Sequence, residues 1–539
     1  MRPLPNLISA KELRARIVDG SELALIDLRE EGLFANRHLL FAKSISLSRL
    51  ELRVAALVPR RNVLIVLCEK GSDTTLVDQG AERLAEFGYS DISILEGGID
   101  AWERAGFELF SGVNVPSKAF GEFVEHSSGT PHISASDVNR MMAAGENMII
   151  LDSRPMPEYN MMSIPTAINV PGAELAYRLA DLAPDPETTV IVNCAGRTRS
   201  IIGAQSLINA GVPNKVIALE NGTMGWHLAG FELDHGEHRR YSKISDNARA
   251  LAIKRSHAVA ERFGVQTTGL ETVQTWQADP DRTIFILDVR APEEFEAGHL
   301  AGSISAPGGQ LVQATDQYVG VHGARLVLVD DDGVRATMTA AWLIQLGWSD
   351  VAVLAGGLNG AGELQTGGYQ PPVLGLKSGD VETVSPAALS AKLENEDVTV
   401  IDLATSLRYR DDGHIPGSWF AIRSRMPQNL DKVPQSDTLV LTSPDGVLAR
   451  ITATDDALKG CHVVVLEGGT NAWRAAGMPV ETGFSNMADV TEDLWYRPYD
   501  MDDGDEGAMK QYLSWEVNLV AQVERDGTTD FRTFPKTSE

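Results

Sequence analysis

Cysteine is scarce in this chain: its 539 residues include three, Cys68, Cys194 and Cys461. So few thiols exclude a disulfide framework, and the lack of a CxxC pair gives no indication of a zinc site. We therefore expect a reducing, cytoplasmic location and no bound metal. Each thiol is either buried and inert or individually reactive, and its surroundings decide between the two.

Positive charge and long apolar stretches are also in short supply. With 47 basic and 74 acidic residues the formal net charge is −27, which disfavours nucleic-acid and anionic-membrane partners because both need clustered positive charge. No run approaches about 18 consecutive apolar residues, so no membrane span is expected. The segment from Met1 to Asn6 lacks the apolar region of a secretory signal. The remaining composition, 43% hydrophobic and 22% charged, is typical of a globular chain of about three to five domains.

A unit of three signatures recurs four times. An apolar run through an aspartate comes first, as Leu25–Arg29, Ile150–Arg154, Ile286–Arg290 and Val400–Ala404. About 40 residues later comes a second apolar run, as Val63–Leu67, Thr189–Asn193, Arg325–Val329 and Thr438–Thr442. A glycine-containing turn closes each unit, at Leu95–Gly98, Leu219–Gly222, Leu354–Gly357 and Leu466–Gly469. Three of these turns are followed by tryptophan, as Trp102, Trp226 and Trp473.

Short apolar strands that alternate with amphipathic helices are typical of parallel βαβ units. In the second unit the helical pattern runs from Ile201 to Ile208 and ends at Gly211. We therefore predict an α/β fold of four tandem domains, each a parallel sheet flanked by helices. The expected ranges are 1–125 (module 1), 126–240 (module 2), 266–375 (module 3) and 376–484 (module 4), with a helical linker at 241–265 and a C-terminal tail at 485–539.

The loop after the second apolar run of module 2 carries the candidate chemistry. It reads Cys194-Ala195-Gly196-Arg197-Thr198-Arg199-Ser200 and leads into the predicted helix. Ligands of an α/β sheet bind beyond the carboxyl ends of its strands, where such a loop enters a helix. A thiol there faces backbone N–H groups and the positive end of the helix dipole, and the two arginines further favour the thiolate. We expect Cys194 to be the nucleophile and residues 195–200 to bind an anionic substrate.

The Asp-x-Arg run, the cysteine-headed loop, the glycine turn and the tryptophan together resemble the rhodanese family of sulfurtransferases, over nearly the whole chain. The resemblance implies a thiosulfate sulfurtransferase without a cofactor, in which Cys194 takes the outer sulfur of a small anionic donor, becomes a persulfide and passes the sulfur to a thiol or to cyanide. Thiosulfate and a related persulfide or thiosulfonate remain open as donors, and the physiological acceptor remains open too. Asp152, Arg154 and Glu158 match family positions, and we expect them to form structural salt bridges.

A phosphatase or arsenate reductase and a non-catalytic scaffold are the alternative functions. Dual-specificity phosphatases share the fold, but their loop places an arginine six positions after the cysteine, whereas Arg199 is five positions after Cys194 and position 200 is serine. That spacing disfavours a phosphatase or an arsenate reductase. A non-catalytic scaffold would fit the altered loops of the other modules, but not the intact loop of module 2.

Modules 1, 3 and 4 are expected to be inactive or weak. Aligning their loops on the preceding strand places Cys68, Asp330 and Ser443 opposite Cys194. Asp330 heads a run of three aspartates that is predicted to be a solvated turn, and Ser443 has no neighbouring base to activate it. Acidic neighbours oppose thiolate formation at Cys68, which is either an inert thiol or a second sulfur-carrying site. Cys461 is expected to fill the core of module 4.

A basic cluster, His238-Arg239-Arg240, follows module 2. Because such a cluster is unusual in an acidic chain, we hypothesise that it reaches over the Cys194 loop and binds the anionic end of a larger donor. The C-terminal tail contains an acidic run, Asp500–Glu506, and is predicted to pack on the modules, with no assigned role.

Overall fold

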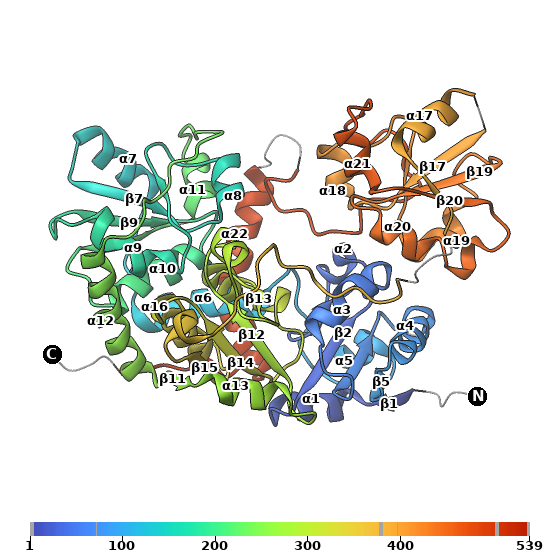
Figure 1. Ribbon diagram of the computed structural model, residues 1–539. Coiled ribbons are helices and arrows are strands. Elements are labelled where there is room, and N and C mark those ends of the chain that lie inside the picture. The colour runs from blue at the N-terminus through green and yellow to red at the C-terminus, as the bar shows by residue number, and fades with distance from the viewer. Residues whose placement is uncertain (1–4, 72, 377–380, 396, 502–505, 536–539) are drawn as a thin grey trace.

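The computed structural model describes residues 5–71, 73–376, 381–395, 397–501 and 506–535. These residues contain four five-stranded sheets with one shared topology, and every strand pair in them is parallel. In each sheet the first strand of the module lies at one edge, followed in space by the fifth, fourth, second and third. The prediction of four parallel α/β domains is confirmed. Figure 1 shows module 4 set apart at the upper right, above module 1.

The elements of modules 1 and 2 follow each other in matching order. Module 1 contains β1 (Asn6–Ile8), α1 (Ala10–Val18), β2 (Leu23–Asp27), α2 (Glu31–Phe34), β3 (Lys43–Ser44), α3 (Leu50–Leu57), β4 (Leu64–Cys68), α4 (Thr75–Glu86), β5 (Ile92–Leu95) and α5 (Gly98–Arg104). Helix α6 (Val115–Ser128) leads into module 2. Module 2 contains β6 (His132–Ile133), α7 (Ala135–Ala144), β7 (Met148–Asp152), α8 (Met156–Met161), β8 (Ile168–Asn169), α9 (Glu174–Leu182), β9 (Thr189–Asn193), α10 (Thr198–Asn209), β10 (Val216–Leu219) and α11 (Gly222–Leu228).

Modules 3 and 4 repeat the same order. After helix α12 (Asp246–Phe263), module 3 contains β11 (Gln266–Thr268), α13 (Leu270–Gln277), β12 (Ile284–Asp288), α14 (Pro292–Ala297), β13 (Ile304–Ser305), α15 (Gly308–Gln313), β14 (Arg325–Val329), α16 (Val334–Gln345) and β15 (Val351–Leu354). Module 4 contains β16 (Thr383–Val384), α17 (Pro386–Asn395), β17 (Val398–Asp402), α18 (Ser406–Asp411), β18 (Trp419–Phe420), α19 (Met426–Asn429), β19 (Thr438–Thr442), α20 (Val447–Thr452), β20 (Val463–Leu466) and α21 (Gly469–Ala475). Short 3-10 turns are η1 (Leu47–Arg49), η2 (Thr315–Gln317), η3 (Gly357–Gly360), η4 (Arg423–Arg425) and η5 (Asp456–Leu458).

The second position of each glycine turn requires glycine for a steric reason. Gly222 has φ +56°, and a Cβ there would lie 2.3 Å from the carbonyl oxygen of Cys194. The second glycine of the other three turns approaches the loop of its own module in the same way. The first position, also left-handed, is Asn221 in module 2, a residue type that tolerates this conformation. The turn therefore presses against the loop that carries the candidate chemistry.

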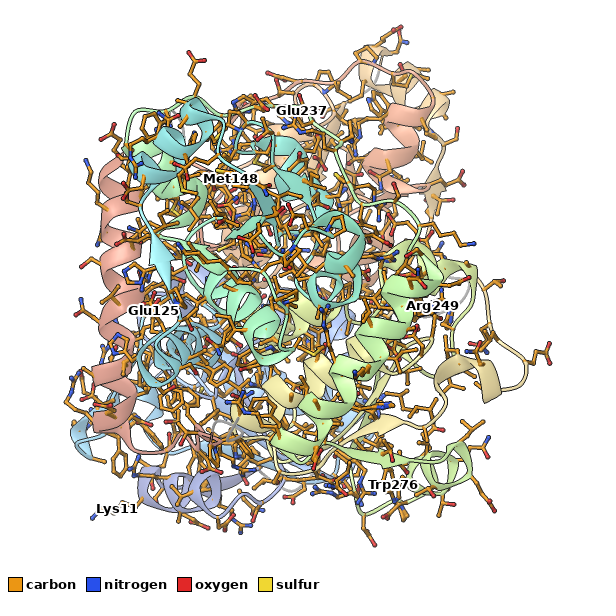
Figure 2. The ribbon with its side chains drawn as sticks, turned by 90° about the vertical axis from the view of Figure 1, so that its left-hand side faces the viewer. Lys11, Glu125, Met148, Glu237, Arg249 and Trp276 are labelled. Atoms are coloured by element: carbon orange, nitrogen blue, oxygen red, sulfur yellow. The ribbon has the colours of Figure 1, made fainter. Side chains whose placement is uncertain are left out.

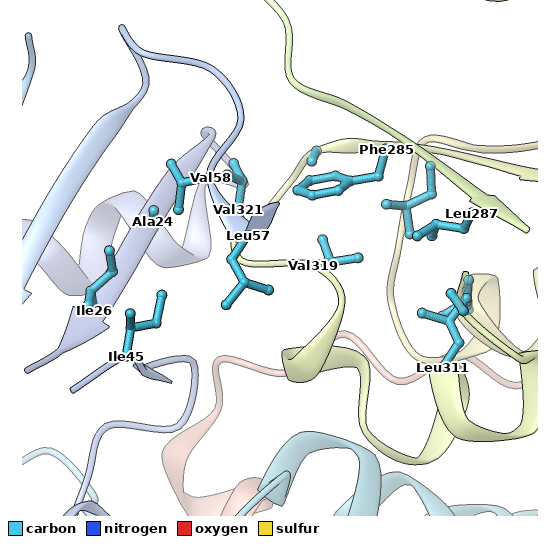
Figure 3. Packing of buried hydrophobic residues seen from close by; sticks show 14 of the residues in the cluster. Ala24, Ile26, Ile45, Leu57, Val58, Phe285, Leu287, Leu311, Val319 and Val321 are labelled. Carbon is cyan, nitrogen blue, oxygen red and sulfur yellow. The ribbon is translucent and has the colours of Figure 1, made fainter. Parts of the chain in front are cut away.

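Modules 1 and 3 share one continuous apolar core. Leu57 and Val58 of module 1 belong to the same buried cluster as Phe285 and Val321 of module 3, as Figure 3 shows. The N–H of Gly320 donates to the carbonyl oxygen of Leu57 over 3.1 Å. Because the cluster also includes Phe120 of α6 and Ile201 of α10, burial of apolar surface holds the first three modules together.

The predicted tail contains two structural parts. Residues 485–500, here called the strap, run from module 4 back to the other modules, and helix α22 (Glu506–Asp526) follows. Figure 2 shows α22 along one side of the molecule, near the labelled Glu125 of α6, in agreement with the contacts between the two helices. Within the described residues, no helix is both long and apolar enough to cross a membrane.

Candidate active site

Cys194 follows directly after β9 and lies four residues before the start of α10. Its side chain lines a cavity of about 380 Å³, although only 2% of the residue is exposed to solvent. The carbonyl oxygen of Cys194 accepts a hydrogen bond from the N–H of Thr223 over 2.8 Å. The apolar strand β9 and the glycine turn thus fix the residue from both sides, at the wall of this cavity.

The cavity is built by every part of the chain. Module 2 supplies the Cys194 loop, Glu158 and Met224, and module 1 supplies Glu31 and the start of α6 with Asn114 and Lys118. Residues from Gln310 to Tyr318 come from module 3, and Leu407 comes from module 4. The strap contributes residues 494, 495 and 497–500, and α22 contributes Tyr512. The walls of the cavity around the Cys194 loop thus come mostly from outside module 2.

Arg199 lies at the cavity in a paired arrangement. Its Nη1 and Nη2 atoms donate to both carboxylate oxygens of Glu158, over 2.9 and 2.7 Å, and Nη1 also donates to Gln310 Oε1 over 2.9 Å. Burial alone would raise the pKa of Glu158, but the charge and hydrogen bonds of Arg199, with help from Arg154, hold that pKa at about 2. Glu158 is therefore ionised at neutral pH and fixes the orientation of Arg199.

Arg197 lines the cavity, and its guanidinium is hydrogen-bonded to other side chains of the protein. Its Nε and Nη2 donate to Glu122 over 2.6 and 2.7 Å, Nη2 also binds Glu125, and Nη1 donates to Asn221. All three nitrogens of this guanidinium thus already donate to protein groups, and its direct contact with the donor stays a prediction. Glu122, Glu125 and His126 lie close enough together to hold a cation, but the Arg197 guanidinium occupies two of these carboxylates.

The remaining loop residues divide between packing and the cavity. Ala195, Gly196 and Thr198 line the cavity, and Thr198 also packs against Gly121 and donates through Oγ1 to Glu516 over 3.3 Å. Ser200 does not face the cavity, contrary to the prediction, because its hydroxyl and its N–H both donate to the carbonyl oxygen of Arg197. Within the described chain, the N–H groups of residues 195–199 have no hydrogen-bond acceptor, so they are available to an anion in the cavity.

The strand register corrects the alignment of Cys68 with Cys194. Asp152 pairs with Asn193 in module 2, whereas the equivalent Asp27 pairs with Cys68 itself. The predicted strand Val63–Leu67 is therefore one residue too early, since β4 spans Leu64–Cys68. The N–H of Ile99 donates to the carbonyl of Glu69, as that of Thr223 does to the carbonyl of Cys194. The counterpart of Cys194 in module 1 is Glu69.

Cys68 accordingly belongs to the core. It is fully buried in an apolar cluster of module 1, and burial, with the charge of Asp27, raises the pKa of its thiol well above the ordinary value. Cys461, predicted to fill a core, is instead exposed, because it precedes β20 in the loop after η5 and its side chain is not part of the sheet.

In modules 3 and 4 the equivalent side chain fills its own loop. Asp330 accepts hydrogen bonds from the N–H groups of Gly333, Arg335 and Ala336 over 2.6, 2.9 and 3.2 Å. It is fully buried, so the prediction of a solvated turn is wrong at this residue. Ser443 Oγ accepts from the N–H of Ala449 over 3.3 Å. In module 1, burial raises the pKa of Glu69 to about 7.

Two further predictions concern the salt bridge of Arg154 and the basic cluster after module 2. Arg154 donates to both oxygens of Asp152 over 2.7–3.2 Å, and modules 1 and 3 repeat this pair as Arg29–Asp27 and Arg290–Asp288, so its structural role is confirmed. The hypothesis about His238-Arg239-Arg240 is wrong. Arg239 binds Asp234 and Glu237, and Arg240 binds Glu293, so this segment lies outside the cavity lining.

Sequence reasoning missed the strap and Lys118. Arg497, Tyr499 and Trp495 line the cavity although they follow Cys194 by about 300 residues of chain. The aromatic and basic composition of the segment Trp495-Tyr496-Arg497-Pro498-Tyr499, unusual within an acidic tail, was the available signal. No such sequence signal pointed to Lys118, because it belongs to an ordinary helical pattern.

The Rhodanese-like domain family matches residues 9–105, 134–229, 270–363 and 385–476. The chain belongs to this family. A solved structure described as thiosulfate sulfurtransferase from Pseudomonas aeruginosa is 48% identical and has a TM-score of 0.94, covering 98% of this chain and 100% of that one. The predicted rhodanese-type sulfurtransferase with four tandem modules is therefore confirmed at the level of family and enzyme type.

Two further proteins are similar to shorter parts of the chain. The HTH-type transcriptional regulator Rv0324 of Mycobacterium tuberculosis is 36% identical over 110 residues, which are 20% of this chain and 47% of that protein. The putative sulfur carrier protein YrkF of Bacillus subtilis is 25% identical over 136 residues, which are 24% of this chain and 72% of that protein. The matched part of the chain thus spans about half the length of the regulator.

Proposed function

We propose that this protein moves a sulfane sulfur from thiosulfate, or from a related persulfide or thiosulfonate, to a thiol or cyanide through a persulfide on Cys194. The observation that carries the proposal is the position of that thiol. It lines a cavity, beside Arg199 and a loop whose N–H groups have no acceptor among the described residues. At the equivalent position the other three modules have Glu69, Asp330 and Ser443, which cannot form a persulfide.

The reaction proceeds in two displacement steps on sulfur. The Cys194 thiolate attacks the outer sulfur of thiosulfate, a new S–S bond forms, and the old S–S bond breaks with its electron pair leaving on sulfite. The loop N–H groups, at the start of α10, stabilise the negative charge of the donor and of the persulfide anion. An acceptor thiolate or cyanide then attacks the outer sulfur of the persulfide and regenerates the Cys194 thiolate.

The test is the intact mass of the protein after brief exposure to thiosulfate. Wild type, Cys68→Ser and Cys461→Ser should each gain the mass of one sulfur atom, and Cys194→Ser should gain none. Cys68 and Cys461 are matched controls because one is buried in a core and the other is exposed. Uptake that persists in Cys194→Ser and disappears in Cys68→Ser would transfer the assignment to module 1. No uptake by any variant, from thiosulfate or from glutathione persulfide, would favour a scaffold.

A further inference from the structure

Four cationic side chains line the cavity around Cys194, and they differ in how far other groups already occupy them. Arg197 has Glu122, Glu125 and Asn221 as partners. Arg199 has Glu158 and Gln310 as partners. Each of these two side chains is about one tenth exposed, at 9%. Both arginines therefore shape the loop and leave little of the guanidinium to a ligand.

Lys118 also has partners within the protein. Its Nζ donates to the hydroxyl of Tyr512 over 2.6 Å and lies 2.9 Å from Glu516 Oε1. Glu516 is fully buried and also accepts hydrogen bonds from Tyr512 and Thr198. This network ties helix α22 to the start of α10, and it neutralises the charge of Lys118.

Arg497, on the strap, is the exception among the four. Its Nε and Nη2 donate to Asp500 over 2.7 and 2.8 Å, but its Nη1 has no hydrogen-bond partner among the residues that the structure describes. The side chain is 38% exposed and its guanidinium carbon lies 4.6 Å from the centre of the Tyr499 ring. A fixed guanidinium with one free edge, inside the cavity of the thiol, is suited to an oxyanion.

The strap is held in place by modules 1 and 4. Asp493 accepts the N–H of Ser406 over 2.7 Å at the start of α18, and Asp489 accepts the N–H of Ile422 over 2.7 Å. On the other side, Gly32 donates to the carbonyl of Glu492, and Trp495 donates to Glu31 over 3.1 Å. Modules 1 and 4, which have Glu69 and Ser443 where module 2 has Cys194, thus position the segment that lines the cavity.

We propose that Arg497 binds the anionic end of the sulfur donor, so that the strap determines which donors react. This inference rests on the function proposed above. Arg497 Nη1 donates to a sulfonate oxygen of thiosulfate while the outer sulfur of the donor faces Cys194. The acceptor half of the reaction involves the persulfide alone and makes no use of Arg497 when the acceptor is uncharged.

The experiment separates the two halves of the reaction. In a two-step transfer, kcat/KM for the donor reports only sulfur uptake, and kcat/KM for the acceptor reports only sulfur release. With thiosulfate as donor and dithiothreitol, an uncharged thiol at neutral pH, as acceptor, Arg497→Gln should lower kcat/KM for thiosulfate about 10- to 100-fold, the range for a charged hydrogen bond. The value for dithiothreitol should stay within about twofold. Arg497→Lys should recover part of the loss, because it keeps the charge without the planar geometry.

A matched control is Arg408→Gln. Arg408, whose side chain is 45% exposed, pairs with Asp412 at the end of α18 and does not line the cavity, so both kinetic values should remain at the wild-type level. An equal loss for thiosulfate and dithiothreitol in Arg497→Gln would mean a structural role and would overturn the inference, and so would no loss at all. A wild-type protein that takes up no sulfur would instead overturn the proposed function itself.

Discussion

The Cys194 loop of module 2 and the Asp330 loop of module 3 have the same length and contain an arginine at the same position. They differ in the side chain that begins the loop, because only the one in module 3 binds the N–H groups of its own loop. Asp330 fills the module 3 loop by accepting three of its N–H groups. In module 2 the corresponding N–H groups of Arg197 and Arg199 have no acceptor among the described residues, and they lie at the cavity that Cys194 lines. The comparison teaches that the fold provides an anion-binding loop in either case, and that activity requires a side chain that does not bind to the loop itself.

The arginines of the two loops, Arg335 and Arg199, also differ in the number of carboxylates that pair with them. Arg335 binds Glu294, Glu174 and Asp331, whereas the only carboxylate partner of Arg199 among the described residues is Glu158. The difference comes from a reciprocal contact between the modules. Glu174 of module 2 reaches Arg335, and Gln310, at the same place in module 3, reaches Arg199. A neutral amide thus leaves more positive charge beside the thiol.

The largest expected effect concerns the filled loop. Asp330→Ala leaves the N–H groups of Gly333, Arg335 and Ala336 without an acceptor, so the free energy of unfolding should fall by about 3 kcal/mol. Cys194→Ala, at the empty loop, should lower it by less than about 1 kcal/mol while it abolishes transfer. Thermal unfolding of the full chain measures both changes. Equal destabilisation by the two variants would contradict the distinction between a filled and an empty loop.

The pair of Arg199 and Glu158 should contribute to stability in a pH-dependent way. Glu158 has a pKa of about 2 in the folded protein and about 4.3 when unfolded. Because the folded-state pKa is the lower one, the stabilisation is fully present above the unfolded value and is lost as the pH falls towards 2. Glu158→Gln should therefore destabilise the chain on the order of 2 kcal/mol at pH 7.

Denaturation of wild type and Glu158→Gln across this pH range checks the prediction. The difference between the two proteins should shrink steadily between about pH 4.3 and pH 2. A difference that stays constant over that range would show that the carboxylate of Glu158 does not stabilise Arg199 through its charge.

The smallest effect tests the reciprocal contact. Gln310→Glu gives Arg199 a second carboxylate, as Arg335 has, and should lower kcat/KM for thiosulfate about tenfold through added negative charge near the dianionic donor. Thermal stability should hardly change, because the new carboxylate has a cationic partner. Gln313→Glu, which also lines the cavity from α15, is the control for charge without contact to Arg199. Equal losses in the two variants would show that general repulsion, and not Arg199, is responsible.

Much of this protein follows from local pattern. The apolar runs predict β9, β14 and β19 at their actual positions, because strands buried in a parallel sheet are continuous apolar segments. The end of the module 2 helix near Gly211 is also correct, since that glycine adopts φ +65°. The error at Cys68 arose because an apolar run with a cysteine at its end does not reveal which residue is the last of the strand. Only the pairing with Asp27 gives that register.

The sequence by itself determined four α/β modules, the single complete loop at Cys194 and the pairing of Asp152 with Arg154, since these depend on residues close together in the chain. The tertiary structure decided what surrounds the thiol. It turned Arg197 towards Glu122, brought Gln310 to Arg199 and placed Arg497 in the cavity. These contacts join segments that are far apart in the chain, and they form only because the packing of four modules and a tail brings the segments together, which no local periodicity records.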